Sequence, residues 1–330
     1  MRLAIDAMGG DYAPHEVVLG AVAARDLLPE TEIILVGDQS AILSELKGAG
    51  ADAGRFTIVH ASEVVEMAES PVDAIRKKPD SSMRRAVELM AAGQADAVIS
   101  AGNTGAFVAA SHMLNKRLAG IRRPGISVVF PTYHGPVVLI DVGANVDSRP
   151  IHLVQYALMA DIYARHVIGI NAPRVGILSI GEESEKGNEL VKQAGNMLRR
   201  TNLNFLGNAE GRDLFNGRFD VVVCDGFVGN VVLKTVEGLV TNMFRVIMGE
   251  VRTLDPAAIA KVGPVMKELQ KRHDSEEYGG APLLGVSGVV TICHGNSRSR
   301  AIANAFRAAA TCVRMQVNQR IVEAVAQIGE

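Results

Sequence analysis

The chain has 330 residues, of which 48% are hydrophobic and 21% charged, with a formal net charge of −2. This composition is typical of a soluble globular protein, and Asp6 and Asp11 interrupt any apolar signal segment at the start. The weak net charge, the absence of Trp and an aromatic content of only 4% disfavour a nucleic-acid partner. Three cysteines without metal-ligand spacing predict reduced, buried thiols in a cytoplasmic protein.

Short apolar runs alternate with segments of helical periodicity in the first part of the chain. The runs at 3–6, 33–36 and 56–60 predict strands, and those at 16–28 and 39–49 predict helices. This alternation indicates an α/β fold with a doubly wound, mostly parallel sheet. We expect one catalytic domain that spans residues 1–330.

The same unit, an apolar run followed by a small or polar loop, occurs six times. The carboxyl ends of parallel strands are where open α/β sheets bind ligands, so we expect these loops to form a site. The candidate binding residues from the first three loops are Asp6, Gly9, Gly10, Asn103, Thr104, Gly105, Asp141 and Asn145.

A basic loop lies between two predicted helices at residues 69–85. Its candidate contacts are Arg76, Lys77 and Lys78, with Ser81 beside them. A solvated turn is one interpretation, and a cationic loop that meets a phosphate or an acidic partner is the other. Ser81 and Ser82 are predicted to cap a helix over 83–92.

The middle of the chain departs from strict alternation. The runs at 126–130 and 137–140 predict a hairpin, and a helix is expected over 151–169. The loop GEESEKGN at 181–188 follows another predicted strand and holds Lys186 and Asn188. Its carboxylates lack the spacing of a metal site. Lys186 either stabilises a developing oxyanion or pairs with Glu182 or Glu183 at the surface.

The clearest unit is FDVVVCDGFVGNVVLKTVEG at 219–238. Val221–Val223 predict a buried strand, and the residues from Val231 onward follow helical spacing. This stretch by itself fits either an ordinary βα turn with glycines for geometry or a loop whose backbone N–H groups bind an anion, with Lys234 one turn into the helix. Because similar loops recur along the chain, we expect the anion-binding loop. The candidate residues of this loop are Asp225, Gly226, Gly229 and Asn230.

The last third of the chain predicts a helical insert at 236–275, a turn region at 279–288, a strand at 289–293 and a helix at 299–328. Prolines and apolar residues near 254–266 interrupt the insert. They indicate packing against the chain or a second subunit, or an interfacial membrane contact. His294 follows the final strand and is a candidate binding residue, although a lone histidine is more often structural.

Several motifs are absent, including G-x-G-x-x-G, the P-loop and G-x-S-x-G, so dinucleotide, ATP and serine-hydrolase chemistry lack support. Read together, the motifs IDAMGGD, SAGNTGA, DVGAN, IGEESEKGN, CDGFVGNVVLK and GGAPLLGV resemble the bacterial phosphate acyltransferases of the PlsX family. The resemblance runs from the first predicted strand to the last helix. It implies an α/β/α sandwich like that of phosphotransacetylases and isopropylmalate dehydrogenases, with a protruding helical pair.

The resemblance also implies a reaction and its partners. A long-chain acyl group would pass from acyl carrier protein to inorganic phosphate, without a cofactor or a metal, and a membrane acyltransferase would use the acyl phosphate. The protein would be a cytoplasmic homodimer that contacts the inner face of the cell membrane through residues 236–275. Lys186 and Asn230 are the expected catalytic residues. The alternatives are a short-chain, coenzyme A-dependent phosphate acyltransferase, a decarboxylating dehydrogenase of similar fold, and a non-catalytic carrier-protein scaffold.

Overall fold

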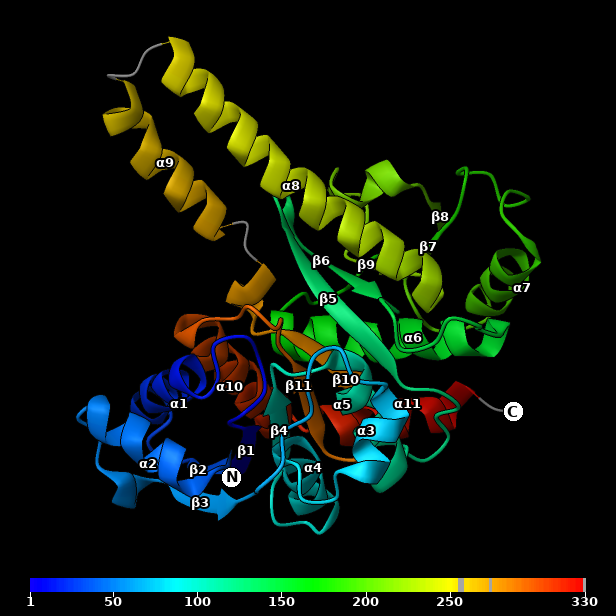
Figure 1. Ribbon diagram of the computed structural model, residues 1–330. Helices are drawn as coiled ribbons and strands as arrows, with labels where there is room; N and C mark the ends of the chain where they lie inside the picture. Colours follow the sequence, from blue (N-terminus) through cyan, green and yellow to red (C-terminus); the bar gives the residue numbers. More distant parts are fainter. Residues whose placement is uncertain (255–257, 273–274, 329–330) are drawn as a thin grey trace.

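A computed structural model describes residues 1–254, 258–272 and 275–328, which form a large sheet with helices on both faces (Figure 1). The strands are β1 Arg2–Asp6, β2 Glu32–Gly37, β3 Thr57–His60, β4 Ala97–Ser100, β5 Gly125–Thr132, β6 Gly135–Ile140, β7 Val175–Leu178, β8 Phe205–Ala209, β9 Val221–Val223, β10 Ala281–Leu284 and β11 Val289–Ile292. The α-helices are α1 His15–Leu27, α2 Gln39–Gly48, α3 Pro71–Lys77, α4 Ser82–Ala91, α5 Thr104–Leu114, α6 Pro150–Tyr163, α7 Glu189–Leu198, α8 Gly226–Leu254, α9 Ile259–Arg272, α10 Ser299–Arg314 and α11 Val317–Ile328.

The sheet consists of two parallel halves that run in opposite directions. Its strand order is β3-β2-β1-β4-β11-β10-β5-β6-β9-β7-β8. The strands β3, β2, β1, β4 and β11 are parallel to one another, and so are the strands β6, β9, β7 and β8. The pairs β11–β10, β10–β5 and β5–β6, which join the two halves, are antiparallel. The predicted mostly parallel sheet is confirmed, but its strands do not all end at one edge.

The register of the central strands nevertheless brings the two sets of carboxyl ends together. Ile292, the last residue of β11, pairs with Ala281, and β10 then pairs with β5 near Ile126. From the other half, Ile140 at the end of β6 pairs with Ser127, in the same part of β5. The loops after β11 and β6 therefore meet in the middle of the sheet, beside β5.

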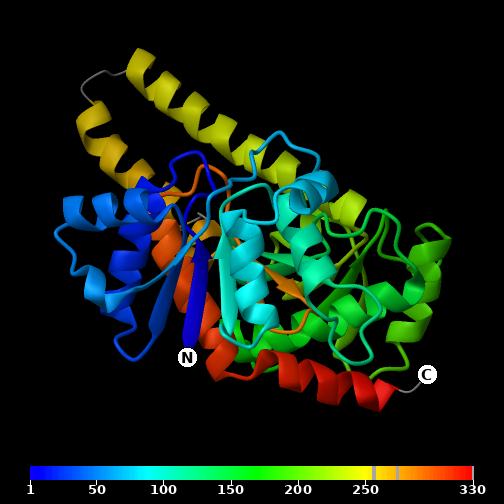
Figure 2. The same ribbon diagram turned by 60° about the horizontal axis from the view of Figure 1, so that its bottom comes forward.

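Two layers of helices cover the sheet, which confirms the α/β/α sandwich. Successive strand residues point to opposite faces, so Leu3 and Ile5 join one buried cluster while Ala4 joins the other. The first cluster packs under α1, α2, α6, α7, α10 and α11, and the second under α3, α4 and α5 (Figure 2). These buried, mainly aliphatic layers hold the strand ends and their loops in fixed positions.

Several predicted elements are confirmed, with three differences. The hairpin of β5 and β6 is present, and the helix predicted over 151–169 is α6 followed by a π-helical turn at Ala164–Ile168. The turn region at 279–288 contains β10, and the final predicted helix is two helices because Gln316 adopts a left-handed φ of 53°. The loop expected before Val231 is already helical, because α8 begins at Gly226.

Helices α8 and α9 project from the body as a pair (Figures 1 and 2). The outer part of α8 exposes Leu239, Met243 and Ile247 at helical spacing, and Leu254 near the tip is 81% exposed. Residues 255–257 of the predicted apolar tip, and 273–274 at the end of the predicted insert, lie outside the described residues. Among the described helices, none is long and apolar enough to span a membrane.

Candidate active site

A cavity of about 250 Å³ lies where the carboxyl ends of the two half-sheets meet. Its buried lining is mostly aliphatic and its exposed lining is polar, so an apolar interior opens through a polar mouth. The buried apolar residues are Ile126, Val128, Val142, Leu233, Ile292 and Ala301. An apolar pocket with a few convergent polar groups is the usual form of a small-molecule site.

Four of the sequence-predicted residues come together in this lining. They are Thr104 from the first turn of α5, Asn230 and Lys234 from α8, and His294 from the loop after β11. Asn230 and Lys234 are four residues apart and so lie on the same face of α8. Segments separated by up to 190 residues in the chain thus form one wall.

Glu237, which was not predicted as a site residue, connects two of these side chains. Its Oε2 lies 2.8 Å from Lys234 Nζ, and its Oε1 lies 3.5 Å from His294 Nε2. Oε1 is buried and has no hydrogen-bond partner among the described residues. The spacing of Glu237 three residues after Lys234 was the available sequence signal, because such residues are neighbours on a helix.

Three N–H groups at the start of α8 that were expected to bind an anion already have partners within the chain. Gly226 N–H donates to Asn145 O at 3.0 Å, Val228 N–H to Asp225 Oδ1 at 3.0 Å, and Gly229 N–H to Asp225 O at 2.9 Å. The Asp225 carboxylate therefore caps the helix where an anion was expected. The two glycines are needed for a different reason, since a Cβ on Gly229 would lie 1.9 Å from Asp141 O.

Asp141 is buried and organises the loop after β6. Its Oδ1 accepts N–H bonds from Ile126, Gly143 and Ala144, and its Oδ2 accepts one from Asn145 at 2.8 Å. Burial raises the pKa of Asp141, and these backbone hydrogen bonds oppose the increase. The Asn145 side chain donates to Pro124 O at 2.6 Å. Both predicted binding residues therefore hold the protein's own backbone.

Asp6 has a similar role on the other half-sheet. Its carboxylate accepts hydrogen bonds from Ser82 Oγ at 2.6 Å and Ser100 Oγ at 2.8 Å, and burial raises its pKa. Gly9 passes directly over it, because a Cβ there would lie 2.4 Å from Asp6 Oδ2. Gly10 has a φ of +114°, which favours glycine. These residues fix the loop after β1 against β4.

Asn103 caps α5 and ties down a distant loop. Its Oδ1 accepts the Ala106 N–H at 3.0 Å, while its Nδ2 lies within 3.3 Å of three carbonyl oxygens in residues 66–69. Gly105 makes room for Pro71, whose Cγ would lie 2.7 Å from an added Cβ. Of this motif, Thr104 lines the cavity.

The basic loop at 69–85 is partly neutralised within the chain. Lys78 pairs with Glu69 at 2.7 Å and donates to Val64 O, whereas Arg76 and Lys77 are exposed. Ser81 lies at the N-cap of α4, as predicted, but neither serine caps the helix with its side chain. Ser81 Oγ donates to Lys78 O instead, and the Ser82 hydroxyl donates to the buried Asp6.

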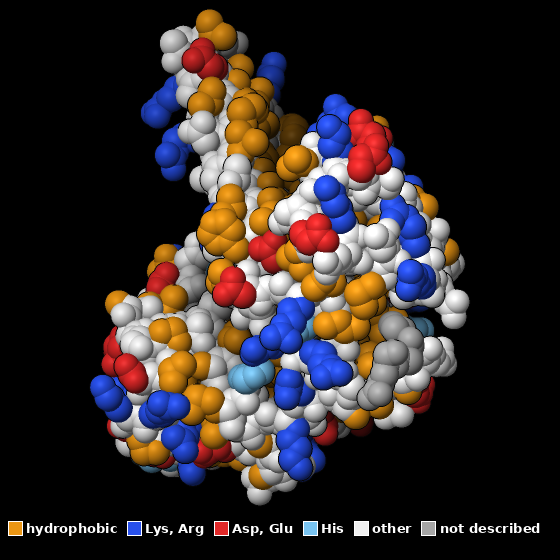
Figure 3. All heavy atoms as spheres, turned by 90° about the vertical axis from the view of Figure 1, so that its right-hand side faces the viewer, with side chains coloured by type: hydrophobic (Ala, Val, Ile, Leu, Met, Phe, Trp, Pro, Cys, Tyr) orange, Lys and Arg blue, Asp and Glu red, His pale blue; other side chains and the backbone are white. Residues whose placement is uncertain are grey.

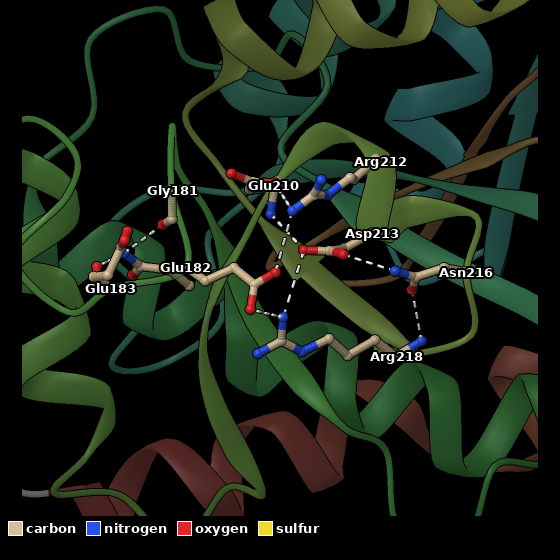
Figure 4. A network of polar contacts seen from close by, with 9 residues as sticks. Gly181, Glu182, Glu183, Glu210, Arg212, Asp213, Asn216 and Arg218 are labelled. Carbon is tan, nitrogen blue, oxygen red and sulfur yellow. Dashed lines mark hydrogen bonds and ion pairs between the residues drawn. The ribbon is translucent and has the colours of Figure 1, made fainter.

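The loop after β7 lies outside the cavity lining and carries Lys186 and Asn188. Glu182 pairs with Arg212 and Arg218 rather than with Lys186, as the network in Figure 4 shows. Asn188 caps α7 by accepting the Val191 N–H at 3.0 Å. The Lys186 side chain is exposed, and the loop follows the strand next to β9. Among the described residues no group of three or more His, Cys, Asp or Glu could hold a metal ion.

A second group of cations, which we call the arginine patch, comes from the segment between α5 and β5 and from the N-cap of α6. Its members are Arg117, Arg122, Arg123 and Arg149. Burial first, and then the nearby arginines, lower the pKa of His112 and His152. No patch member forms an ion pair with a carboxylate among the described residues. Figure 3 shows Lys and Arg side chains gathered around a histidine on this side of the molecule.

Structural comparison defines the class of fold. The chain is similar to a phosphotransacetylase from Streptococcus pyogenes, with a TM-score of 0.64 and 16% identity over 97% of this chain and 94% of that one. It is also similar to a branched-chain phosphotransacylase from Enterococcus faecalis, with a TM-score of 0.60 and 16% identity over 95% and 99% of the two chains. The fold is therefore that of the phosphotransacetylases, as expected.

Sequence comparison then gives the family. The model of the family described as "Fatty acid synthesis protein" matches residues 1–320. A protein from Geobacter sulfurreducens named phosphate acyltransferase is 50% identical over 98% of this chain and 94% of its own length. One of the same name from Desulforamulus reducens is 50% identical over 98% and 96%. The chain belongs to this family, the PlsX phosphate acyltransferases.

Proposed function

We propose that this protein transfers a long-chain fatty acyl group from acyl carrier protein to inorganic phosphate, which yields acyl phosphate for phospholipid synthesis. The observation that carries the proposal is the cavity, with its aliphatic interior and its mouth of Asn230, Lys234 and His294. An acyl chain matches the interior, and a phosphate and a thioester carbonyl match the polar mouth. Membership of the phosphate acyltransferase family supports the same reaction.

The reaction needs positioning and charge stabilisation more than a protein nucleophile. An ionised phosphate oxygen attacks the thioester carbonyl, the C–S bond breaks, and the thiolate leaves and takes up a proton. Asn230 on the cavity wall donates to the tetrahedral oxyanion, and Lys186 from the neighbouring strand-end loop adds positive charge. Each such donor is worth about 10²–10³ in turnover. These two roles are our proposals for catalysis.

The arginine patch supports an acidic protein as the acyl donor. It lies beside Pro124, whose carbonyl is held by Asn145, and Asn145 O in turn accepts the first N–H of α8. The patch is thus one loop away from the cavity wall, and it is not neutralised by the described chain. A cluster of arginines attracts acidic surfaces over distances of about 8–10 Å.

The apolar stripe on α8 supports the proposed homodimer. Leu239, Met243 and Ile247 are between 38% and 59% exposed and recur every four residues, as in helix-to-helix interfaces. Leu254 extends the stripe toward the tip, where a peripheral contact with the inner face of the cell membrane would bury it. We place the protein in the cytoplasm at that surface, next to the membrane acyltransferase that uses its product.

The decisive experiment mixes the purified protein with long-chain acyl carrier protein, with and without phosphate, and traps the product with hydroxylamine. Phosphate-dependent loss of thioester with a trappable acyl phosphate is the expected result. Turnover with short-chain acyl coenzyme A alone would replace the proposal with the short-chain reaction. Binding of carrier protein without turnover would favour a scaffold.

A further inference from the structure

Beside the polar mouth of the cavity, Glu237 contacts the lining residues Lys234 and His294 and holds one acceptor that the protein leaves unused. Glu237 Oε1 is buried and lacks a hydrogen-bond partner among the described residues, although its sister oxygen is 2.8 Å from Lys234 Nζ. A buried carboxylate oxygen without a donor costs free energy, so such an atom is commonly completed by a ligand. His294 Nε2, at 3.5 Å, is too distant to satisfy it well.

Donors flank this acceptor on both sides. Lys234 and His294 both line the cavity, and each lies next to one oxygen of Glu237. A ligand placed between them meets two nitrogen groups that attract oxyanion oxygens, and one carboxylate oxygen that requires a proton donor. The three groups together therefore fit an oxyanion that still carries a hydroxyl.

The start of α8 is the nearest alternative position for a phosphate, but groups of the protein already occupy it. At the start of α8 the N–H groups of Gly226, Val228 and Gly229 already donate to protein oxygens, and Asp225 supplies negative charge there. One to two turns farther along, Lys234 keeps a side chain that is 58% exposed at the cavity. The cationic end of the site therefore lies on the third turn of α8.

We propose that Lys234, Glu237 and His294 form the subsite for hydrogen phosphate, in which the P–OH group donates to Glu237 Oε1. This inference rests on the proposed function, since it locates the acyl acceptor. Lys234 and His294 contact the charged oxygens, one of which attacks the thioester while the hydroxyl stays on Glu237. Phosphate and arsenate keep a hydroxyl at neutral pH, whereas sulfate does not. Glu237 therefore selects against sulfate by charge repulsion and by the missing donor.

Calorimetric titration with inorganic phosphate, arsenate and sulfate tests the subsite without turnover. For the wild-type protein we expect phosphate and arsenate to bind at least about tenfold more tightly than sulfate. Equal affinity for sulfate would overturn the proposal, and this measurement needs no variant. Because this titration does not involve an acyl donor, its result does not depend on whether the protein catalyses the proposed acyl transfer.

The Glu237→Gln variant tests the residue itself. An amide is isosteric and offers an N–H donor, so we expect phosphate affinity to fall about tenfold and sulfate affinity to rise. Glu250→Gln, on an exposed outer turn of the same helix, is the matched control and should bind like wild type. An unchanged preference for phosphate over sulfate in a folded Glu237→Gln protein would refute the role of Glu237.

Discussion

Replacement of Gly229 by alanine should damage the site from a position that contacts no substrate. An added Cβ would lie 1.9 Å from Asp141 O and 2.9 Å from Cys224 Sγ. Ordinary contact begins near 3.4 Å, so α8 and the loop after β6 must separate by about 1.5 Å. The obstacle is a backbone carbonyl whose residue is fixed by its own hydrogen bonds, so it cannot rotate away as a side chain could.

The cost follows from this geometry. Overpacking in a close-packed region destabilises by about 1–3 kcal/mol, and we expect the upper end of that range because backbone is involved. Alanine recovers at most about 1 kcal/mol of helix propensity. Displacement of α8 also moves Asn230, the next residue, and a shift of about 1 Å in an active site can lower turnover about 10²-fold.

A second glycine in the same helix provides the control. A Cβ on Gly238 meets nothing within 4 Å, so Gly238→Ala should stabilise the protein by about 0.5–1 kcal/mol and leave turnover unchanged. Urea unfolding and the phosphate-dependent loss of thioester measure both variants. If Gly229→Ala were as stable and active as Gly238→Ala, close approach at Gly229 would not be what positions α8.

Four further changes test other parts of the structure. Glu16 accepts the first N–H of α10, and this hydrogen bond is the main reason that its pKa is lowered. Glu16→Gln should cost about 1 kcal/mol in urea unfolding at pH 7, and this difference should vanish as the pH falls through the lowered pKa of Glu16. Charge reversal at Arg122 and Arg123 should raise KM for acyl carrier protein more than about tenfold but leave KM for acyl pantetheine unchanged; equal effects on both donors would remove the patch from docking. Met243→Asp should convert the proposed dimer into a monomer in sedimentation experiments, and a persistent dimer would place the interface elsewhere. Lys186→Ala should lower turnover about 10²–10³-fold with unchanged unfolding, whereas wild-type turnover would exclude Lys186 from catalysis.

The sequence predicted the layers of the fold well because each depends on local periodicity. Buried runs such as Val221–Val223 and the amphipathic spacing of the helices identify strands and helices without tertiary information. The directions of the strands could not be predicted in this way, since no local pattern distinguishes two opposed half-sheets from one parallel sheet. The pairing of Ile140 with Ser127, which places the end of β6 beside the end of β11, is a long-range property.

The candidate site was predicted in part, for a related reason. Asp6 and Asn103 follow strands in polar loops, as ligand-binding residues do, but their polar atoms are used by groups that lie 34–94 residues away in the sequence. Sequence reasoning identifies where polar groups concentrate. It does not reveal which of them the fold has already satisfied, because that depends on which distant segments pack against each loop.

Which polar groups already have hydrogen-bond partners also decides where an anion fits on α8. A glycine-rich strand-to-helix turn suggests binding at the helix start, but that inference requires N–H groups without partners. Here Asp225 and Asn145 fill those positions, which leaves little for a phosphate to contact. Farther along the helix the situation is reversed, because Glu237 Oε1 has too few partners and Lys234 faces the cavity. We therefore propose that the unsatisfied atoms, rather than the glycines, mark where the phosphate binds.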